Sequence, residues 1–154
     1  MAHDAGVVHY VDDDPARRLI AEAFGAQTRP SAARSRRRTT TIRYDVVVEA
    51  SSRAAGVRRA IRSLAPGGIC TAVGYYLGAG TRVPLMHMYA TDAALRVGVS
   101  HARAALPELL AFIARSGFPA ERATTLTADW DDAPAAYAAR TTKVVLQRDV
   151  VSTP

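Results

Sequence analysis

The chain is organised around one stretch, Tyr44 to Tyr76, which has the pattern of a strand, a helix and a second strand. The run Val46-Val47-Val48 is unbroken and β-branched, which is typical of a strand buried on both faces of a parallel sheet. From Arg53 onward, apolar residues recur at helical spacing until Pro66-Gly67-Gly68 stops the pattern. A second apolar strand, Ile69 to Val73, follows. This order predicts a βαβ unit.

The two strands of a βαβ unit are parallel, so their carboxyl ends meet at one edge of the sheet, where α/β proteins bind ligands. The residues at these ends are Ala50 and Ser51 after the first strand, and Val73, Gly74 and Tyr75 after the second. We therefore expect these five residues to lie along a ligand-binding edge. For Tyr75, the alternative is that the ring only covers the edge of the sheet.

The composition is that of one α/β domain, or of part of one, with 49% hydrophobic residues in a chain of 154. Cys70 is the only cysteine, which excludes an internal disulfide and a zinc site built from cysteines. No apolar run reaches the roughly 20 residues that span a membrane, and the N-terminus does not have the pattern of a signal peptide. These features predict a cytoplasmic protein.

The net charge of +6 comes from one stretch. Residues 27–43 contain arginines and no acidic residue, whereas elsewhere the basic residues equal the 14 acidic ones in number. A proline, serines and clustered charge predict a solvated basic loop. The arginines between Arg34 and Arg38 would also suit a polyanion, but no aromatic residue is interleaved for base stacking. Nucleic-acid binding is therefore the less favoured alternative.

The N-terminal segment predicts a short strand and a capped helix. Val7 to Val11 is suited to the strand, and Asp14 before Pro15 is a typical helix start, with an acceptor at the cap and a proline in the first turn. The helix should run to about Phe24 and end at Gly25, which can take a left-handed conformation.

Asp12 stands at the tip of this first strand. In dinucleotide-binding folds, an acidic residue in that position accepts hydrogen bonds from the hydroxyls of the adenosine ribose. Asp13 would add repulsion toward the 2′-phosphate of NADP, so the pair favours NAD as the cofactor. The alternative is an acidic loop that merely caps the following helix.

Several motifs in this order resemble the medium-chain, zinc-type alcohol dehydrogenases. They are V-V-H-Y-V-D-D-D-P-A-R-R-L-I-A-E-A-F-G-A, Y-D-V-V-V-E-A-S, L-A-P-G-G-I-C-T-A-V-G, L-R-V-G-V-S-H-A and T-K-V-V-L. Each motif is weak alone, and the resemblance rests on their order and spacing across nearly the whole chain except residues 27–43. It implies an α/β fold with an incomplete Rossmann-like parallel sheet and flanking helices. It also implies an NAD-dependent oxidoreductase that transfers hydride between nicotinamide and an alcohol or carbonyl carbon.

The resemblance adds three residues to the expected cofactor site. Gly98 and Val99, at the end of a strand from Leu95 to Val99, would lie near the nicotinamide carboxamide, and Lys143 would reach the pyrophosphate. For Lys143, the alternative is a structural place beside a buried strand. His101, just after the strand, is interpreted as an ordinary surface histidine and not as an acid or base.

Two parts of the family pattern are missing. The sequence has no G-x-G-x-x-G turn for the pyrophosphate, and the six residues before Val7 are too few for the strand and turn that precede it in relatives. The domain that would bring the zinc ligands is missing as well, so we expect no zinc and weak or no activity alone. In the strand order 3-2-1-4-5-6, the missing strand 1 lies between the strands predicted at Val7–Val11 and Val46–Val48. A direct pairing of those two strands is the alternative to leaving both unpaired.

We expect a partial Rossmann domain over residues 1–101, a helix and strands over 102–149 that in the family pack on the catalytic domain, and a tail over 150–154. The helix from Ala104 to Arg115 should turn Leu106, Leu109, Leu110 and Ile113 inward. Apolar faces without the missing domain would need a homo-oligomer or a completing chain. The alternative functions are a non-catalytic subunit or interaction remnant and, less favoured, a polyanion binder.

Overall fold

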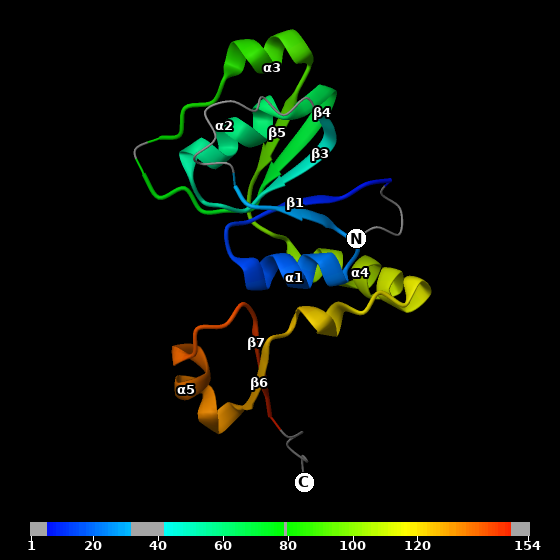
Figure 1. Ribbon diagram of the computed structural model, residues 1–154, viewed down its shortest axis with the longest axis vertical. Coiled ribbons are helices and arrows are strands. Elements are labelled where there is room, and N and C mark those ends of the chain that lie inside the picture. The colour runs from blue at the N-terminus through cyan, green and yellow to red at the C-terminus, as the bar shows by residue number, and fades with distance from the viewer. Residues whose placement is uncertain (1–5, 32–41, 79, 149–154) are drawn as a thin grey trace. The chain divides into compact units, whose positions relative to one another are not determined.

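The computed structural model describes residues 6–31, 42–78 and 80–148 (Figure 1). Contacts divide the chain into two compact units, one made of Met1–Arg34 and Ala105–Pro154, the other of Ser35–Ala104. Every strand pair in the described residues is parallel. The fold is therefore mixed α/β with parallel sheets and flanking helices, as predicted from the sequence.

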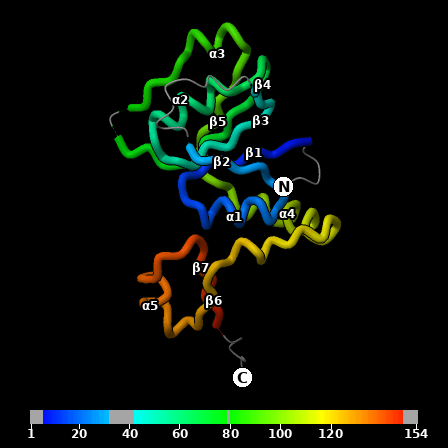
Figure 2. The backbone as a smooth tube through the Cα atoms, viewed as in Figure 1, coloured from blue at the N-terminus to red at the C-terminus, as the bar shows by residue number. Residues whose placement is uncertain are grey.

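The unit Ser35–Ala104 contains the predicted βαβ unit, and Figure 2 traces its path. Its elements in chain order are β3 (Tyr44–Glu49), α2 (Ala54–Arg62), β4 (Leu64–Ala72), α3 (Leu85–Thr91) and β5 (Ala94–Val97). The strands pair in the order β3-β4-β5, so β4 is central. The sequence pattern thus places a strand, a crossover helix and a parallel strand correctly.

The boundary between α2 and β4 differs from the prediction. α2 ends at Arg62, and β4 runs through Pro66-Gly67-Gly68, the segment expected to stop the helix. The pairing register shifts within this segment, because Tyr44 lies opposite Leu64 whereas Val46 lies opposite Ile69. β4 therefore carries extra residues as a bulge, which sequence periodicity does not reveal.

The core of this unit lies between α2 and one face of the sheet. It consists of Val57, Ala60 and Ile61 from α2 together with Leu64 and Cys70 from β4. Ile61, Leu64 and Cys70 are fully buried. The apolar stripe predicted for the helix is thus the stripe that packs on the strands.

On the other face of the sheet, β3 is exposed in the described part of the chain, and the prediction for the valine run was wrong in this respect. Val47 packs against the core, but Val46 and Val48 are 64% and 65% exposed. Successive side chains point to opposite faces of a strand, so these two valines share the face away from α2. The run resembles a fully buried strand because its sequence suits two covered faces, and only one is covered within the described residues.

The other unit contains two small sheets, each a parallel pair. β1 (His9–Val11) pairs with β2 (Gln27–Arg29), and α1 (Pro15–Ala23) connects them. β6 (Leu126–Asp129) pairs with β7 (Val144–Gln147), and α5 (Ala133–Ala138) lies between them in the chain. Short 3-10 helices, η1 (Ala120–Ala123) and η2 (Trp130–Asp132), flank β6.

The start of α1 confirms the predicted cap. The Asp14 side chain accepts hydrogen bonds from the backbone amides of Ala16 and Arg17, and Gly25 follows the helix with a φ of 84°. The prediction of a loop from residue 27 was wrong for its first residues, because β2 forms there by pairing with β1. The basic residues Arg34 to Arg38 lie outside the described residues.

The strands near Val7 and Val46 do not pair directly. β1 and β3 belong to different sheets, ordered β1-β2 and β3-β4-β5. Compared with the doubly wound order 3-2-1-4-5-6, the two sheets correspond to strands 3-2 and 4-5-6. Within the described part of the chain, no strand takes the place of strand 1.

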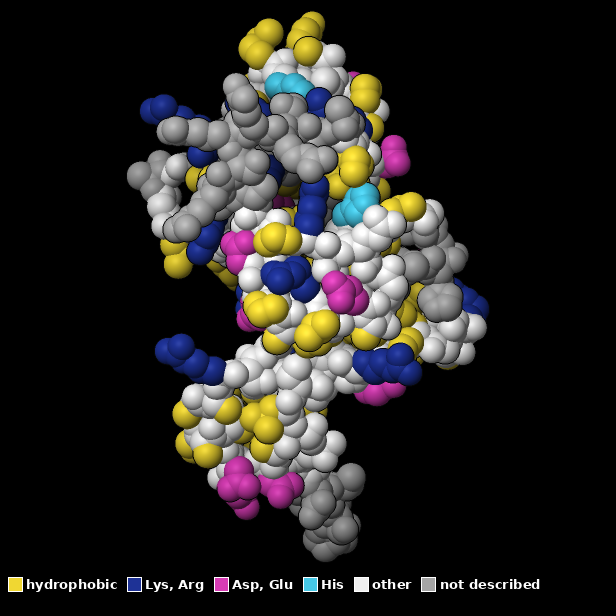
Figure 3. Space-filling model, viewed as in Figure 1, with side chains coloured by type: hydrophobic (Ala, Val, Ile, Leu, Met, Phe, Trp, Pro, Cys, Tyr) yellow, Lys and Arg dark blue, Asp and Glu magenta, His cyan; other side chains and the backbone are white. Residues whose placement is uncertain are grey.

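α4 (Ala102–Ser116) exposes most of its predicted inward face, so the prediction was wrong for the three leucines, whereas Ile113 is half-buried. Leu106, Leu109 and Leu110 are all exposed. Figure 3 shows hydrophobic side chains on the visible surface of the molecule. The periodicity of a helix indicates an apolar stripe, but it does not reveal whether another element covers that stripe. None of the helices in the described residues is long and apolar enough to cross a membrane.

Candidate functional site

The carboxyl ends of β3, β4 and β5 form one aligned edge. Glu49 lies opposite Ala72, and Ala72 lies opposite Val97, so the three strands end side by side. The residues that follow include seven of those predicted for the cofactor site: Ala50, Ser51, Val73, Gly74, Tyr75, Gly98 and Val99. The side chains of Val73, Tyr75 and Val99 are more than half exposed. These residues are therefore accessible on one edge of a parallel sheet.

Ser52 ties the ends of β3 and β4 together and was missed by sequence reasoning. Its φ of 55° is left-handed, and its Oγ accepts a hydrogen bond from the Tyr75 amide at 3.2 Å. A Cβ on Gly74 would lie only 2.8 Å from Ser52 Oγ and 2.9 Å from Ser52 N. Gly74 is thus needed because two backbone segments meet at the edge. Two serines close behind the end of β3 were the available signal.

Glu49 is a second residue that the sequence analysis did not single out. It is 5% exposed, and its Oε1 accepts hydrogen bonds from the Ser51 amide, at 2.9 Å, and from the Ser51 hydroxyl. The carboxylate contacts the place where a Cβ on Gly56 would stand, in the first turn of α2. A negative charge is favourable at the N-terminus of a helix.

Cys70 lies in the core of the same unit. Burial, and to a smaller extent the charge of Glu49, raise the pKa of the Cys70 thiol. A thiol with a raised pKa stays protonated and is a poor nucleophile. Cys70 is therefore a packing residue.

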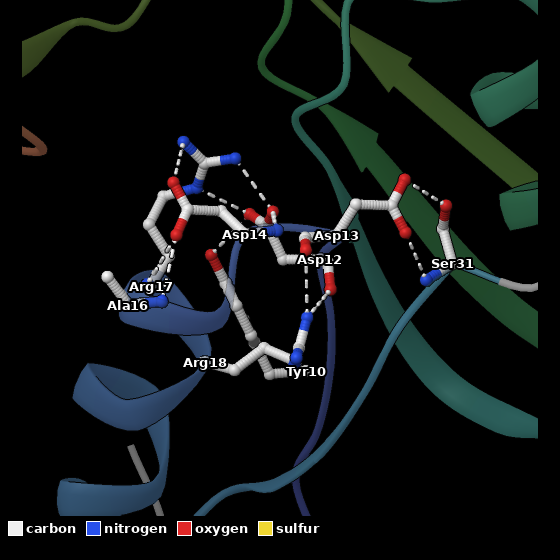
Figure 4. A network of polar contacts seen from close by, with 8 residues as sticks. All are labelled: Tyr10, Asp12, Asp13, Asp14, Ala16, Arg17, Arg18 and Ser31. Carbon is white, nitrogen blue, oxygen red and sulfur yellow. Dashed lines mark hydrogen bonds and ion pairs between the residues drawn. The ribbon is translucent and has the colours of Figure 1, made fainter.

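Asp12 stands at the tip of β1, where its carboxylate accepts four hydrogen bonds (Figure 4). Arg17 donates from Nε and Nη2, both at 2.7 Å, and the Tyr10 hydroxyl and the Asp14 amide each donate at 2.9 Å. The hydrogen-bonded Arg17 guanidinium holds the pKa of the Asp12 carboxyl well below its ordinary range. The Asp12 carboxylate is therefore ionised, held in one orientation, and already hydrogen-bonded to other residues of the same chain.

The neighbouring acids belong to the same polar network (Figure 4). Asp13 accepts from the amide and hydroxyl of Ser31, at 2.8 and 2.6 Å. Arg18 Nη1 donates to the backbone carbonyls of Asp12 and Asp13, at 2.8 and 3.0 Å. Asp14 caps the helix, so capping and ion pairing, the structural alternatives, account for much of the acidic triplet. Arg17 and Tyr10 were missed; an arginine in the first turn after the acid was the available signal.

Lys143 lies just before β7 and has an exposed side chain. Its backbone N–H donates to Thr125 Oγ1 at 2.8 Å, and its carbonyl accepts from the amides of Thr125 and Leu126. These backbone contacts fit the alternative of a structural place beside a strand. Lys143 and Asp12 belong to the unit formed by Met1–Arg34 and Ala105–Pro154, whereas the other seven predicted residues belong to Ser35–Ala104.

The described residues contain no cluster of side chains suited to a metal ion. Nowhere among residues 6–31, 42–78 and 80–148 do three or more His, Cys, Asp or Glu side chains gather as metal ligands would. His101 is exposed beside the start of α4. The donor set in this part of the chain does not fit a zinc ion, which needs three or four such ligands.

Replacing Arg17 with glutamine is expected to lower the free energy of unfolding by about 1–2 kcal/mol at pH 7. This range allows for solvent screening, because the Arg17 side chain is 43% exposed. The folded pKa of Asp12 lies below its unfolded value of about 3.9, so the pair stabilises the fold above about pH 4. That stabilisation is lost as the pH falls through the folded pKa, and the difference between the two proteins should shrink with it.

Denaturant unfolding from pH 7 to pH 2 measures this effect, and Arg18→Gln is the matched control. Arg18 binds backbone carbonyls and not the carboxylate, so its loss should change stability by an amount that varies little with pH. If Arg17→Gln and Arg18→Gln change the pH dependence of the free energy of unfolding equally, the Asp12–Arg17 ion pair does not cause that dependence.

A parallel sheet with an accessible edge at its strand tips, and an acidic residue at the tip of a second parallel pair, are each features of a Rossmann-like fold. Solved structures confirm the resemblance to zinc-type alcohol dehydrogenases. An alcohol dehydrogenase from a Thermus species matches 92% of this chain with 26% sequence identity and a TM-score of 0.79. This chain covers 45% of that dehydrogenase, which is less than half of its length.

Two further solved structures contain a nicotinamide cofactor. An Escherichia coli alcohol dehydrogenase complexed with NADH has 14% identity and a TM-score of 0.77, over 92% of this chain and 44% of that one. A zinc-binding dehydrogenase of Sinorhizobium meliloti bound to NADP has 17% identity and a TM-score of 0.73, over 92% and 45%. No protein-family model matches the sequence, and no curated protein sequence matches it significantly.

Proposed function

We propose that this chain is the NAD-binding part of an alcohol-dehydrogenase-like oxidoreductase. The observation that carries the proposal is the accessible edge where β3, β4 and β5 end together, lined by seven of the residues expected there. Two similar dehydrogenases bound to NADH and NADP give independent support. In the complete enzyme, the bound nicotinamide would exchange hydride with an alcohol or carbonyl carbon.

The strand-tip residues suit the nicotinamide end of a dinucleotide. A Cβ on Gly98 would meet nothing within 4 Å, so the backbone there is open to a ligand. Tyr75 is 78% exposed, and its amide is held by Ser52. We propose that the backbone at Gly98 and Val99 takes the carboxamide, while Tyr75 packs against the ring.

Asp12 would bind the adenosine ribose by exchanging one partner. Its hydrogen bonds from Arg17 are charge-assisted, whereas the Tyr10 hydroxyl is a neutral donor and the easier one to replace. A ribose hydroxyl could take its place on Oδ2, and Arg17 would keep the carboxylate ionised. Asp13 beside it would disfavour a 2′-phosphate, which supports NAD over NADP.

We propose weak or no turnover by this chain alone. The sequence contains no glycine-rich G-x-G-x-x-G turn to hold the pyrophosphate. Positioning of the cofactor and stabilisation of charge in the transition state each contribute several kcal/mol to dehydrogenase catalysis. Lys143 could supply one charge to the pyrophosphate, but it cannot replace a row of backbone amides.

Titration with NADH tests the proposal, with the fluorescence of Trp130 and of the nicotinamide as readouts. We expect saturable binding that weakens about tenfold or more in Asp12→Ala, because a charged acceptor is lost. Asp14→Ala is the matched control: it removes the helix cap but keeps the ribose acceptor. Absence of saturable binding by a protein that unfolds cooperatively would overturn the proposal.

A non-catalytic subunit is the second candidate function, and the exposed leucines of α4 favour it. Such a surface is usually covered by a partner or by another copy of the chain. Sedimentation analysis tests this candidate, which a strictly monomeric and cooperatively unfolding protein would contradict. Polyanion binding through Arg34–Arg38 would depend on residues outside the described ranges, and no observation favours it.

A further inference from the structure

A buried carboxylate lies beneath the turn that connects β3 to α2. Glu49 is 5% exposed, and its Oε2 has no hydrogen-bond partner within the described residues. An unpaired buried acceptor costs stability, so native proteins contain few of them and each calls for a physical reason. The ion pairs found in the described part of the chain do not include Glu49, so charge pairing is not that reason. The role of Glu49 therefore depends on the groups bonded to its other oxygen, Oε1.

Oε1 of Glu49 fixes the conformation of Ser51. It accepts hydrogen bonds from the Ser51 amide, at 2.9 Å, and from the Ser51 hydroxyl. Ser51 Oγ in turn accepts a hydrogen bond from the Arg53 amide at 3.3 Å. Gly56 makes room for this arrangement, because a Cβ there would collide with Ser51 Oγ and Glu49 Oε1. The residues on both sides of Ser52 are therefore held in place.

Ser52, between these two residues, has a strained backbone. Its φ of 55° lies in the left-handed region, which is unfavourable for a residue with a Cβ. Such a conformation persists only where the surrounding contacts enforce it. In this conformation, Ser52 Oγ accepts a hydrogen bond from the Tyr75 amide at 3.2 Å, beyond the end of β4. The hydrogen bonds of Glu49 thus supply part of the constraint that keeps Ser52 within reach of Tyr75.

The backbone of Glu49 makes a separate contact with the same strand end. Its carbonyl accepts a hydrogen bond from the Val73 amide at 2.9 Å. Only Gly74 separates Val73 from Tyr75, so the two amides belong to one short segment. The Val73 amide depends on the backbone of Glu49, whereas the Tyr75 amide depends on its carboxylate through the turn. Comparing these two amides therefore separates an effect of the side chain from a general loosening of the strands.

We infer that Glu49 is a positioning residue for the nicotinamide end of the cofactor site. Its carboxylate holds the turn after β3, so that Ser52 fixes the Tyr75 backbone and with it the ring that we propose to pack against nicotinamide. Glu49 does not touch the cofactor, because its side chain is buried. The role in cofactor binding rests on the proposed function, whereas the effect on the Tyr75 amide does not.

Hydrogen exchange of single amides, followed by NMR on the full chain, tests this positioning. In Glu49→Ala, the Tyr75 amide should exchange about fivefold or more faster relative to the Val73 amide than in the wild type. Glu49→Gln keeps an acceptor oxygen for Ser51 and should restore the protection of Tyr75, although it removes the charge near the N-terminus of α2. Equal acceleration at Val73 and Tyr75 would indicate a merely structural role and overturn the proposal, as would an unchanged Tyr75 amide.

Two serine variants keep the test decisive if Glu49→Ala does not unfold cooperatively. Both serines are exposed, so both variants should fold. Ser51→Ala removes one of the two donors to Oε1 and should accelerate exchange at Tyr75 relative to Val73. Ser52→Ala removes the acceptor of the Tyr75 amide and sets the largest effect. The double variant should exchange no faster than Ser52→Ala, because both changes act through one path. No acceleration in Ser51→Ala, or additive acceleration in the double variant, contradicts the proposal.

Titration with NADH tests the role of Glu49 in the cofactor site. Glu49→Ala should weaken NADH binding about tenfold through the misplaced strand end, and Glu49→Gln should recover most of that loss. Unchanged NADH affinity in a Glu49→Ala protein whose Tyr75 amide is accelerated would overturn this role. If the wild-type protein binds no NADH, the proposed function fails together with the cofactor role of Glu49, whereas the exchange rates at Tyr75 and Val73 still decide whether Glu49 holds this strand end.

Discussion

Replacing Ile61 with alanine is expected to lower the free energy of unfolding of the unit Ser35–Ala104 by about 2–5 kcal/mol. Ile61 is fully buried at the centre of a core formed with Val57, Ala60, Leu64 and Cys70. Truncation removes apolar contacts and leaves a cavity that so small a core cannot easily close. Natural domains are stable by only about 5–15 kcal/mol, so this loss is a large fraction of the total.

Denaturant unfolding with hydrogen exchange at the Cys70 amide measures the effect in the unit that contains Ile61. Leu77→Ala is the matched control, because Leu77 is 96% exposed and its loss should change stability by no more than about 0.5 kcal/mol. Similar losses for both variants would show that Ile61 is not the centre of the core.

The second large effect is expected at Gly68. A Cβ there would lie 2.9 Å from the carbonyl oxygens of Ala65 and Tyr44 and 3.2 Å from that of Asp45. These are backbone atoms, which cannot rotate away as the end of a side chain can. Gly68→Ala should therefore force the bulge of β4 to shift and lower the free energy of unfolding by about 1–3 kcal/mol.

Two other glycines of the same unit, Gly67 and Gly78, separate steric from conformational effects in the same unfolding assay. Gly67 has a φ of 76° and free space around a Cβ, so Gly67→Ala should cost about 1 kcal/mol through backbone strain alone. Gly78 has free space and no left-handed φ, so its alanine variant should be nearly neutral. An order other than Gly68, Gly67, Gly78 in decreasing cost would contradict the close contacts assigned at the bulge.

The two groups of residues expected to bind the cofactor differ in whether their polar groups already have partners within the chain. The strand tips of β3, β4 and β5 are held by Ser52 and Gly74 and remain exposed. Asp12 is instead saturated by Arg17, Tyr10 and the Asp14 amide. The proposed binding of a ribose at Asp12 would therefore have to replace an existing hydrogen bond, so this end should contribute less affinity than a free carboxylate would.

The sequence alone indicated the elements that have a strong local cause. Asp14 and Pro15 start α1, and Gly25 follows its end, because capping and left-handed backbone are properties of single residues. The alternation of strand and crossover helix predicted the parallel pairing of β3 and β4, because that connection has few alternatives. The same pattern placed Ala50 and Gly74 near each other at one edge.

Other features were decided only by tertiary structure. The register shift at Gly68, the exposed face of Val46 and Val48, and the pairing of β2 with β1 all depend on which neighbour lies beside a segment. Local periodicity records only that a side chain is apolar. Asp12 is a similar case. Its position at a strand tip can be predicted from the sequence, but its four hydrogen-bond donors are brought to it only when β1 folds against α1. The sequence therefore determined which residues could form the sheet and the edge where its strands end, and packing between segments decided which of their groups remain exposed.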